Sequence, residues 1–131
     1  MASFVTNNGL AEITGAVVTA NVARQLQWGE GSGATVASNA IASAGTTTEA
    51  RTAGTMSQQT ENTTNDTIQI VGTITAAGSR AITEVGVFDT AGSGSPPTGG
   101  DMIAYGDFSA INLASADSIT FTVRVTLDQA A

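Results

Sequence analysis

The C-terminal segment alternates strictly between apolar and polar side chains. Every second position from 119 to 127 is apolar, and Thr or Arg fills the positions between them. The apolar residues are Ile119, Phe121, Val123, Val125 and Leu127. A period of two places successive side chains on opposite faces of a β-strand, and β-branched Thr suits the solvated face. We therefore predict a half-buried strand, which requires a sheet and an apolar core beside it.

Other segments carry related patterns. Residues 81–89 are apolar at both parities, with Ile82 and Phe88 on one and Val85 and Val87 on the other. This pattern predicts a central strand that is covered on both faces. In residues 22–28, Leu26 and Trp28 are predicted to point inward, and in residues 67–76 the same is predicted of Ile68, Ile70 and Ile74. Further strands are predicted at residues 102–108 and 46–59.

Turn chemistry separates these segments. Residues 76–79 are expected to close a hairpin between strands 67–76 and 81–89, because Gly78 tolerates a positive φ. The Gly- and Pro-rich residues 90–100 predict a loop, and residues 113–117 a turn. Only residues 9–23 offer a helix, against which Gly15 and the β-branched content count. The chain is predicted to be all-β, an antiparallel β-sandwich of jelly-roll or Ig-like type with little or no helix.

The length of 131 residues predicts a single domain over residues 1–131. Residues 29–66 are polar, and Val36, Ile41 and Met56 are their only large apolar side chains. A polar stretch of this length predicts either an ordered arm or plain surface loops.

The charge balance excludes several classes of partner. Charged residues make up 11% of the chain, against about 25% in an ordinary domain. There is no Lys, and four scattered Arg face eleven carboxylates. Nucleic acids and anionic membranes bind clustered cations, so neither is an expected partner. No apolar run is long enough to span a bilayer, and the N-terminus lacks signal-peptide features, so synthesis in a cytoplasm is expected.

Most catalytic chemistry lacks its residues in this chain. Without His or Cys there can be no Ser-His or Cys-His triad, and the preferred zinc ligands are missing. Without Lys there is no Schiff base and no phosphate-binding lysine. Carboxylates remain, but few aromatic residues accompany them as a sugar platform. We expect no enzyme, no catalytic residue and no cofactor.

Glu84 stands out because it lies in the most apolar predicted strand. A buried carboxylate needs a partner, so a structural ion pair with Arg80 or Arg124 is predicted in preference to an acid–base role. A separate hypothesis is that Asp101, Asp107 and Asp117 bind Ca²⁺, although the EF-hand spacing is absent.

Candidate contact residues lie in the polar half of the chain. Residues 28–33 (WGEGSG) predict a flexible turn, because Glu30 would repel a phosphate. Trp28 is either a core residue or an interface anchor. We predict partner contacts at Trp28, Arg51 and Met56.

Several segments, in a fixed order, resemble small tailed-phage virion proteins. Residues 81–89 (AITEVGVFD) resemble the T-E-[VA]-G-[LV]-F-D strand of that group. Residues 102–113 (MIAYGDFSAINL) resemble its strand ending in F-S-x-I-x-L, and residues 116–123 (ADSITFTV) its final G/A-D-S-[IL]-T-F-T strand. Upstream, residues 26–33 (LQWGEGSG) resemble a W-G-x-G element. Shorter similarities at 49–51 and 65–67 extend the resemblance over residues 22–127.

The resemblance implies a β-sandwich virion protein, often a trimer. Some members of the group are capsid cement or decoration proteins, and others are parts of tail fibres. The expectation is therefore a homotrimeric cement protein that binds the major capsid protein on the outer capsid surface of the virion. The alternative is a tail-fibre or tailspike tip that binds a host receptor or glycan, because a shared fold does not fix function. The lack of a long shaft in the sequence favours the cement protein.

Overall fold

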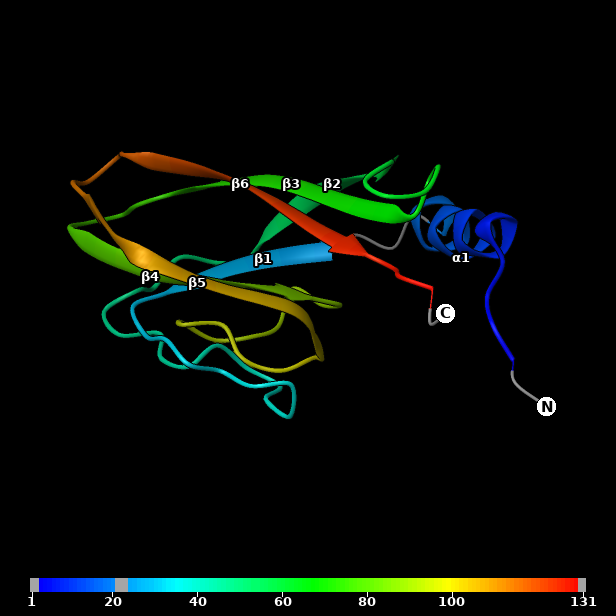
Figure 1. The fold of residues 1–131 in the computed structure, drawn as a ribbon. Coiled ribbons are helices and arrows are strands. Elements are labelled where there is room, and N and C mark those ends of the chain that lie inside the picture. Colours follow the sequence, from blue (N-terminus) through cyan, green and yellow to red (C-terminus); the bar gives the residue numbers. More distant parts are fainter. Residues whose placement is uncertain (1–2, 21–23, 130–131) are drawn as a thin grey trace.

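The computed structural model describes residues 3–20 and 24–129 of the chain and contains one helix and six strands (Figure 1). The prediction of an all-β chain is confirmed, with one helix added at the N-terminal end. In chain order the elements are α1 (Asn7–Thr19), β1 (Arg24–Gly29), β2 (Thr52–Gln59), β3 (Thr67–Thr75), β4 (Arg80–Phe88), β5 (Met102–Leu113) and β6 (Ser118–Thr126).

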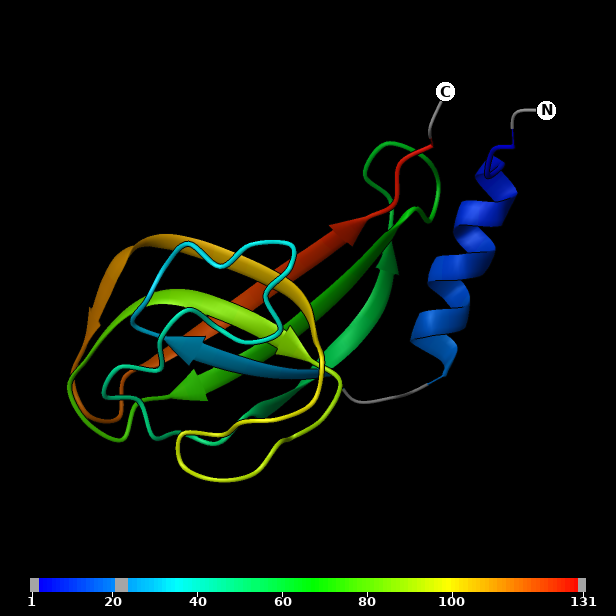
Figure 2. The ribbon, with the colours of Figure 1, turned by 90° about the horizontal axis from the view of Figure 1, so that it is seen from below.

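The strands form one antiparallel sheet in the order β5-β4-β1-β2-β3-β6. The sheet curls until its two edge strands, β5 and β6, approach each other at the turn that joins them, while their other ends diverge (Figures 1 and 2). The result is a nearly closed barrel, so two separate layers of a sandwich are not confirmed. Both edge strands keep one side without a strand partner.

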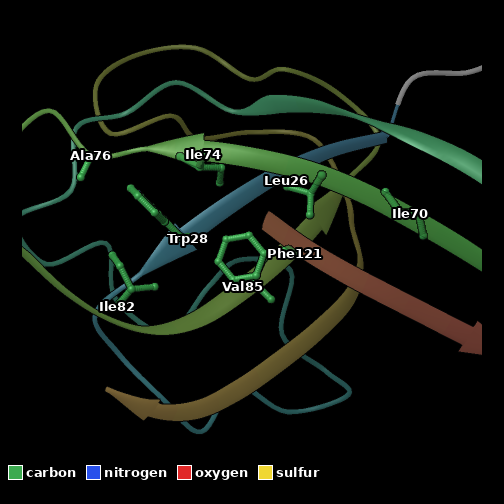
Figure 3. Close-up of a cluster of buried hydrophobic side chains, with 8 residues drawn as sticks. All are labelled: Leu26, Trp28, Ile70, Ile74, Ala76, Ile82, Val85 and Phe121. Carbon is green, nitrogen blue, oxygen red and sulfur yellow. The ribbon is translucent and has the colours of Figure 1, made fainter. Parts of the chain in front are cut away.

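Apolar side chains fill the inside of the curl (Figure 3). Trp28 is 1% exposed and meets the ring of Phe121 edge-on, with 6.4 Å between the centroids. Burying each large side chain contributes about 1.5–3 kcal/mol, and an aromatic pair of this kind adds about 0.5–1.5 kcal/mol. The predicted inward positions are thereby confirmed for the buried members Leu26, Trp28, Ile70, Ile74 and Phe121.

The prediction that residues 81–89 form a strand covered on both faces is also confirmed. Val85 and Ile82 belong to the same core cluster, although their parity differs. The pairing of β4 with β5 shifts register between Ile82 and Glu84, which turns Ile82 inward. Phe88 lies outside that cluster, where the Arg51 guanidinium stacks 3.6 Å from its ring centroid.

The hairpin predicted at residues 76–79 is wrong. Strands β3 and β4 are not neighbours in the sheet, so this turn carries the chain from one half of the sheet to the other. It bonds to the β5–β6 turn: the Ala76 amide donates to the Asp117 carbonyl at 2.8 Å, and the Ala116 amide donates to the Ala76 carbonyl at 2.8 Å. Gly78 does not adopt a positive φ. The two turns together close this end of the barrel.

The single short helix agrees with the expectation of little helix, and it overlaps residues 9–23, the segment that offered one. Thr6 caps it, with its hydroxyl accepting from the Gly9 amide at 3.1 Å. Thr14 donates from its hydroxyl to the Asn65 carbonyl at 2.6 Å, and the Gln58 side chain donates to the Ala11 carbonyl at 2.8 Å. These contacts outweigh the modest helix propensity of the segment. Residues 21–23, included in two of the predicted elements, lie outside the described residues.

Within the described residues, no helix has the length and apolar character that crossing a membrane requires.

Two glycines let β1, β2 and β3 approach closely. A Cβ atom at Gly72 would lie 2.6 Å from Leu26 Cδ1, and one at Gly54 would meet the Ile70 side chain. Real Cβ contacts are not this short, so either substitution overpacks the core.

We expect Gly72→Ala to lower the free energy of unfolding by about 1–3 kcal/mol, since Leu26 must move. Urea unfolding followed by Trp28 fluorescence measures the change. Gly106→Ala is the matched control, because nothing lies within 4 Å of its added Cβ; it should be neutral or stabilising by up to about 1 kcal/mol. Equal losses in the two variants would contradict the packing described.

Candidate functional site

Glu84 is fully buried on the outer face of β4, and four donors surround its carboxylate. Its Oε1 accepts from the amides of Gly31 at 3.0 Å and Ser43 at 2.9 Å. Its Oε2 accepts from the Ala42 amide at 2.8 Å and the Tyr105 hydroxyl at 2.8 Å. Such hydrogen bonds are about twice as strong as neutral ones, so this side chain ties a long loop and β5 to β4.

The predicted burial of Glu84 is confirmed, but the predicted ion pair is wrong. Arg80 binds Glu49 instead, with 3.0 Å between Nη2 and Oε1. Arg124 lies on the surface and binds Glu61 at 3.2 Å. Backbone amides satisfy the oxygens of Glu84, so that it needs no cation.

Gly29 and Gly31 make room for this carboxylate. A Cβ at Gly29 would lie 2.5 Å from Glu84 Oε1, and one at Gly31 would lie 2.9 Å from the same atom. Residues 28–33, which were predicted to form a flexible turn, contain the end of β1 and the two glycines that lie against Glu84. The W-G-E-G and T-E-V-G-V-F-D motifs are physically coupled, because the second needs the glycines of the first.

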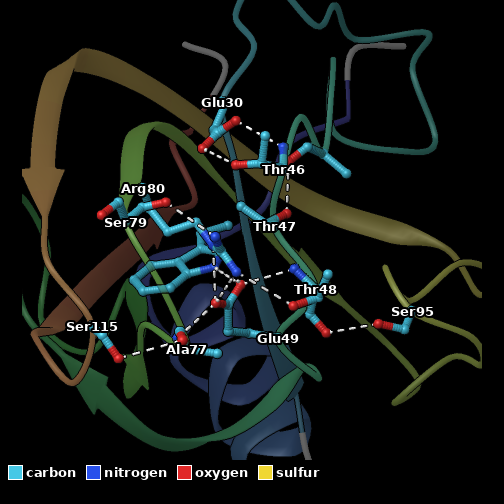
Figure 4. Close-up of polar contacts among 12 residues, drawn as sticks. Glu30, Thr46, Thr47, Thr48, Glu49, Ala77, Ser79, Arg80, Ser95 and Ser115 are labelled. Carbon is cyan, nitrogen blue, oxygen red and sulfur yellow. Dashed lines mark hydrogen bonds and ion pairs between the residues drawn. The ribbon is translucent and has the colours of Figure 1, made fainter.

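Residues 30–51, which make up much of the polar stretch 29–66, form a folded layer of loops. The layer lies on the side of β4 and β5 that faces away from β2, β3 and β6 (Figure 1). The Glu30 carboxylate holds it by accepting from the amide and the hydroxyl of Thr46, at 2.8 and 2.9 Å (Figure 4). Burial acts to raise the pKa of Glu30, but these hydrogen bonds outweigh it and lower the pKa. Of the two alternatives for this part of the chain, loops describe it better than an arm.

Glu49 is a second anchor of the layer and is partly buried (Figure 4). Its carboxylate accepts from the Ala77 amide at 2.9 Å and from Trp28 Nε1 at 3.2 Å, and it pairs with Arg80. Burial would raise its pKa, but the hydrogen bonds and the guanidinium prevail and lower the pKa of Glu49 to about 2.

A segment of this layer, residues 33–39, is clamped to β5 at two points. At one point the Gly33 amide donates to Asp107 Oδ2 at 3.0 Å. At the other, the Asn39 side chain donates to Asp101 Oδ1 at 3.0 Å and accepts from the Met102 amide at 2.7 Å. Between the clamps, residues of the loop and of the strand together line an open pocket.

The space between them is an open groove of about 380 Å³, which we call the β5 groove. None of its lining residues is charged: Ala34, Thr35, Val36, Ser38, Met102, Ile103, Ala104 and Tyr105. Val36 is fully exposed, and Ile103 is 48% exposed. Burial, followed by the hydrogen bond to Glu84, raises the pKa of Tyr105, so its hydroxyl stays a donor. The groove is thus an uncharged surface that exposes apolar side chains and is held by polar contacts at its two ends.

The groove borders a free sheet edge. β5 pairs with β4 alone, and its register shifts beside Ile103, where Phe88 pairs with Met102 and Val87 with Ala104. An uncharged groove that exposes apolar side chains beside an unpaired edge strand is a typical place for a partner chain to bind.

None of the three predicted contact residues lines this groove. Trp28 is 1% exposed in the core. Arg51 is 8% exposed and donates to the Gln27 side chain at 2.9 Å and the Gly99 carbonyl at 2.8 Å. Met56 pairs with Ile70 and packs against the core. Each of them therefore packs within the fold. Val36, one of the three large apolar side chains of the polar residues 29–66, was the sequence signal for the groove.

The three carboxylates predicted as Ca²⁺ ligands accept hydrogen bonds from different parts of the chain. Asp101 and Asp107 clamp the loop, while Asp117 accepts from the Ala114 amide at 2.8 Å in the last turn. Over residues 3–20 and 24–129, no three His, Cys, Asp or Glu side chains gather as a metal site would need.

No protein-family model, no curated protein and no solved structure matches the chain. The resemblance to phage virion proteins thus remains a matter for proposal.

We expect Glu84→Gln to lower the free energy of unfolding by at least about 1–3 kcal/mol, because the amide turns an NH₂ group toward buried donors. Chemical denaturation measures the loss. Glu61→Gln removes an exposed ion pair at the surface and should cost less than about 1 kcal/mol. Equal effects of the two substitutions would refute the anchoring role of Glu84.

The lowered pKa of Glu49 makes stability depend on pH. Its contribution is complete above the ordinary pKa of 4.5 and is lost as the pH falls toward the folded-state value of about 2. The loss from this group should be on the order of 2 kcal/mol. Glu49→Gln should flatten the stability curve in this window, whereas Glu12→Gln on the exposed helix should not. Urea titrations at several pH values test this, and an unchanged slope in Glu49→Gln would contradict it.

Proposed function

We propose that this chain is a capsid cement, or decoration, protein of a tailed bacteriophage, which binds the outer capsid surface through the β5 groove and acts by adhesion. The observation that carries the proposal is the groove itself: it is uncharged, exposes the apolar side chains of Val36 and Ile103, and lies beside a free strand edge. Exposed apolar patches on small proteins commonly mark binding sites.

The composition supports an adhesive role. Charged residues are 11% of the chain, so much of its polar surface carries hydroxyls and amides, which are less costly to desolvate than charges. The sequence also lacks His, Cys and Lys, which removes most nucleophilic and proton-transfer chemistry. A surface of this kind is better suited to contact than to catalysis.

The arrangement of the phage-like motifs also supports the proposal. Glu84, from the T-E-V-G-V-F-D motif, binds the Gly31 amide of the W-G-E-G element. Phe121, from the final strand motif, packs on Trp28. Residues that support one another in this way act as one fold module, and the resemblance therefore concerns the body of the domain.

A cement protein stabilises a capsid through many copies, each of which makes a weak contact. Each copy needs only a modest interface with the major capsid protein, and a homotrimer presents that interface three times. Avidity then turns weak contacts into stable attachment.

Copy number in purified virions tests the proposal. Mass spectrometry of particles that carry this protein should find it on the order of hundreds of copies, comparable with the major capsid protein, as multivalent shell binding requires. Absence from the virion would contradict the proposal. Copy numbers in the tens would also contradict it and would assign the protein to the tail, as expected of a fibre tip.

A further inference from the structure

We infer that the β5 groove takes an extended segment of a different protein, in which two cationic side chains flank apolar ones. Naming the capsid subunit as that protein rests on the proposed function. The chemistry of the segment itself follows from the groove.

The first argument is the free edge. The backbone of β5 is hydrogen-bonded to β4 on one side, and on the other side residues 103–113 have no backbone partner among the described residues. Unpaired strand edges accept an added strand, whose main chain supplies affinity while alternate side chains supply specificity. An extended occupant therefore satisfies this edge better than a helix would.

The second argument is the apolar lining. Val36 projects from the loop and Ile103 from the strand, and both are exposed on opposite walls of the groove. Side chains of the occupant that alternate toward the groove would cover both, which removes apolar surface from water.

The third argument is charge. Asp101 and Asp107 stand at the two ends of the groove, and both are exposed. Each uses one carboxylate oxygen to clamp the loop, and the other oxygen accepts no hydrogen bond within the described residues. No lining residue carries a positive charge. Two cations about six residues apart, or about 20 Å along an extended chain, would complement this rim.

A second copy of the chain fits this rim poorly. The sequence has no Lys, and its four Arg lie at positions 24, 51, 80 and 124, so no segment of it carries two cations about six residues apart. In addition, Arg51 is buried, and Arg80 and Arg124 bind Glu49 and Glu61. A net charge of −7 also opposes approach of another copy to an acidic rim. The occupant is therefore a more basic chain.

The probe is a labelled synthetic peptide with Arg at both ends and Thr-Val-Thr-Val-Thr between them, which places both Arg and both Val on one face of a strand. Fluorescence anisotropy measures its binding to the purified full-length protein. A peptide with Glu in place of both Arg is the matched control. We expect the Arg peptide to bind at least about tenfold more tightly than the Glu peptide at low salt, with the preference shrinking at high salt.

Variants locate the site. Ile103→Asp and, separately, Val36→Asp should each weaken binding of the Arg peptide at least about tenfold. Ile111→Asp is the matched control, because Ile111 is a similarly exposed residue of β5, 41% exposed and beyond the groove; it should leave binding within about twofold. The double variant Asp101→Asn, Asp107→Asn keeps acceptors for the loop and should lose the preference for Arg over Glu.

Three results would overturn the inference. One is equal binding, or none, of the two peptides. Another is an equal effect of Ile103→Asp and Ile111→Asp. The third is light scattering that shows a self-associated species abolished by Ile103→Asp, since the occupant would then be a second copy. None of these depends on virion copy number, so a failure here and a failure of the proposed function can be told apart.

Discussion

A buried carboxylate holds this protein's outer layer in place. Glu84 has no cation beside it, yet its two oxygens receive three backbone amides and one tyrosine hydroxyl. Because the amides belong to residues 31–43 and the hydroxyl to β5, a single side chain fixes the loop to two strands. An unsatisfied buried charge would be costly, so loop and carboxylate stabilise each other. The position of the β5 groove depends on this arrangement.

A second buried carboxylate, Asp66, is also held by backbone amides, so it too needs no cation beside it. Asp66 is buried and accepts from the amides of Glu61, Asn62 and Thr63, which outweigh burial and lower its pKa. A sequence with eleven carboxylates and four Arg cannot pair each acid with a base. Backbone amides of polar, Gly-rich loops supply the missing donors, which explains why such loops are ordered against the sheet. The surface left over is low in charge and suited to contact.

The sequence predicted what depends on local pattern. Alternation located β3 and β6 closely, and double-sided apolarity identified β4 as a covered strand. The pairing of strands and of side chains was harder to predict, because it depends on register and on contacts between residues far apart in the sequence. The β4 register shift reverses Ile82, and the turn at 76–79 joins strands that are not neighbours. Residues 9–23 offered a helix against which their composition counted, and the support for α1 comes from Gln58 and Asn65, far along the chain. Likewise, the prediction that Glu84 is buried was correct, but the predicted ion pair was wrong, because no sequence pattern reveals which amides will approach the carboxylate.

Amide hydrogen exchange in the unmodified protein tests the central claim most directly. If Glu84 anchors the loop layer, the amides of Gly31, Ala42 and Ser43 should exchange as slowly as those in the middle of β4, because opening them exposes a buried carboxylate. The neighbouring Val36 amide, which is on the exposed part of the same loop, should exchange much faster. Exchange of all four amides at the rate of an open loop would contradict the account.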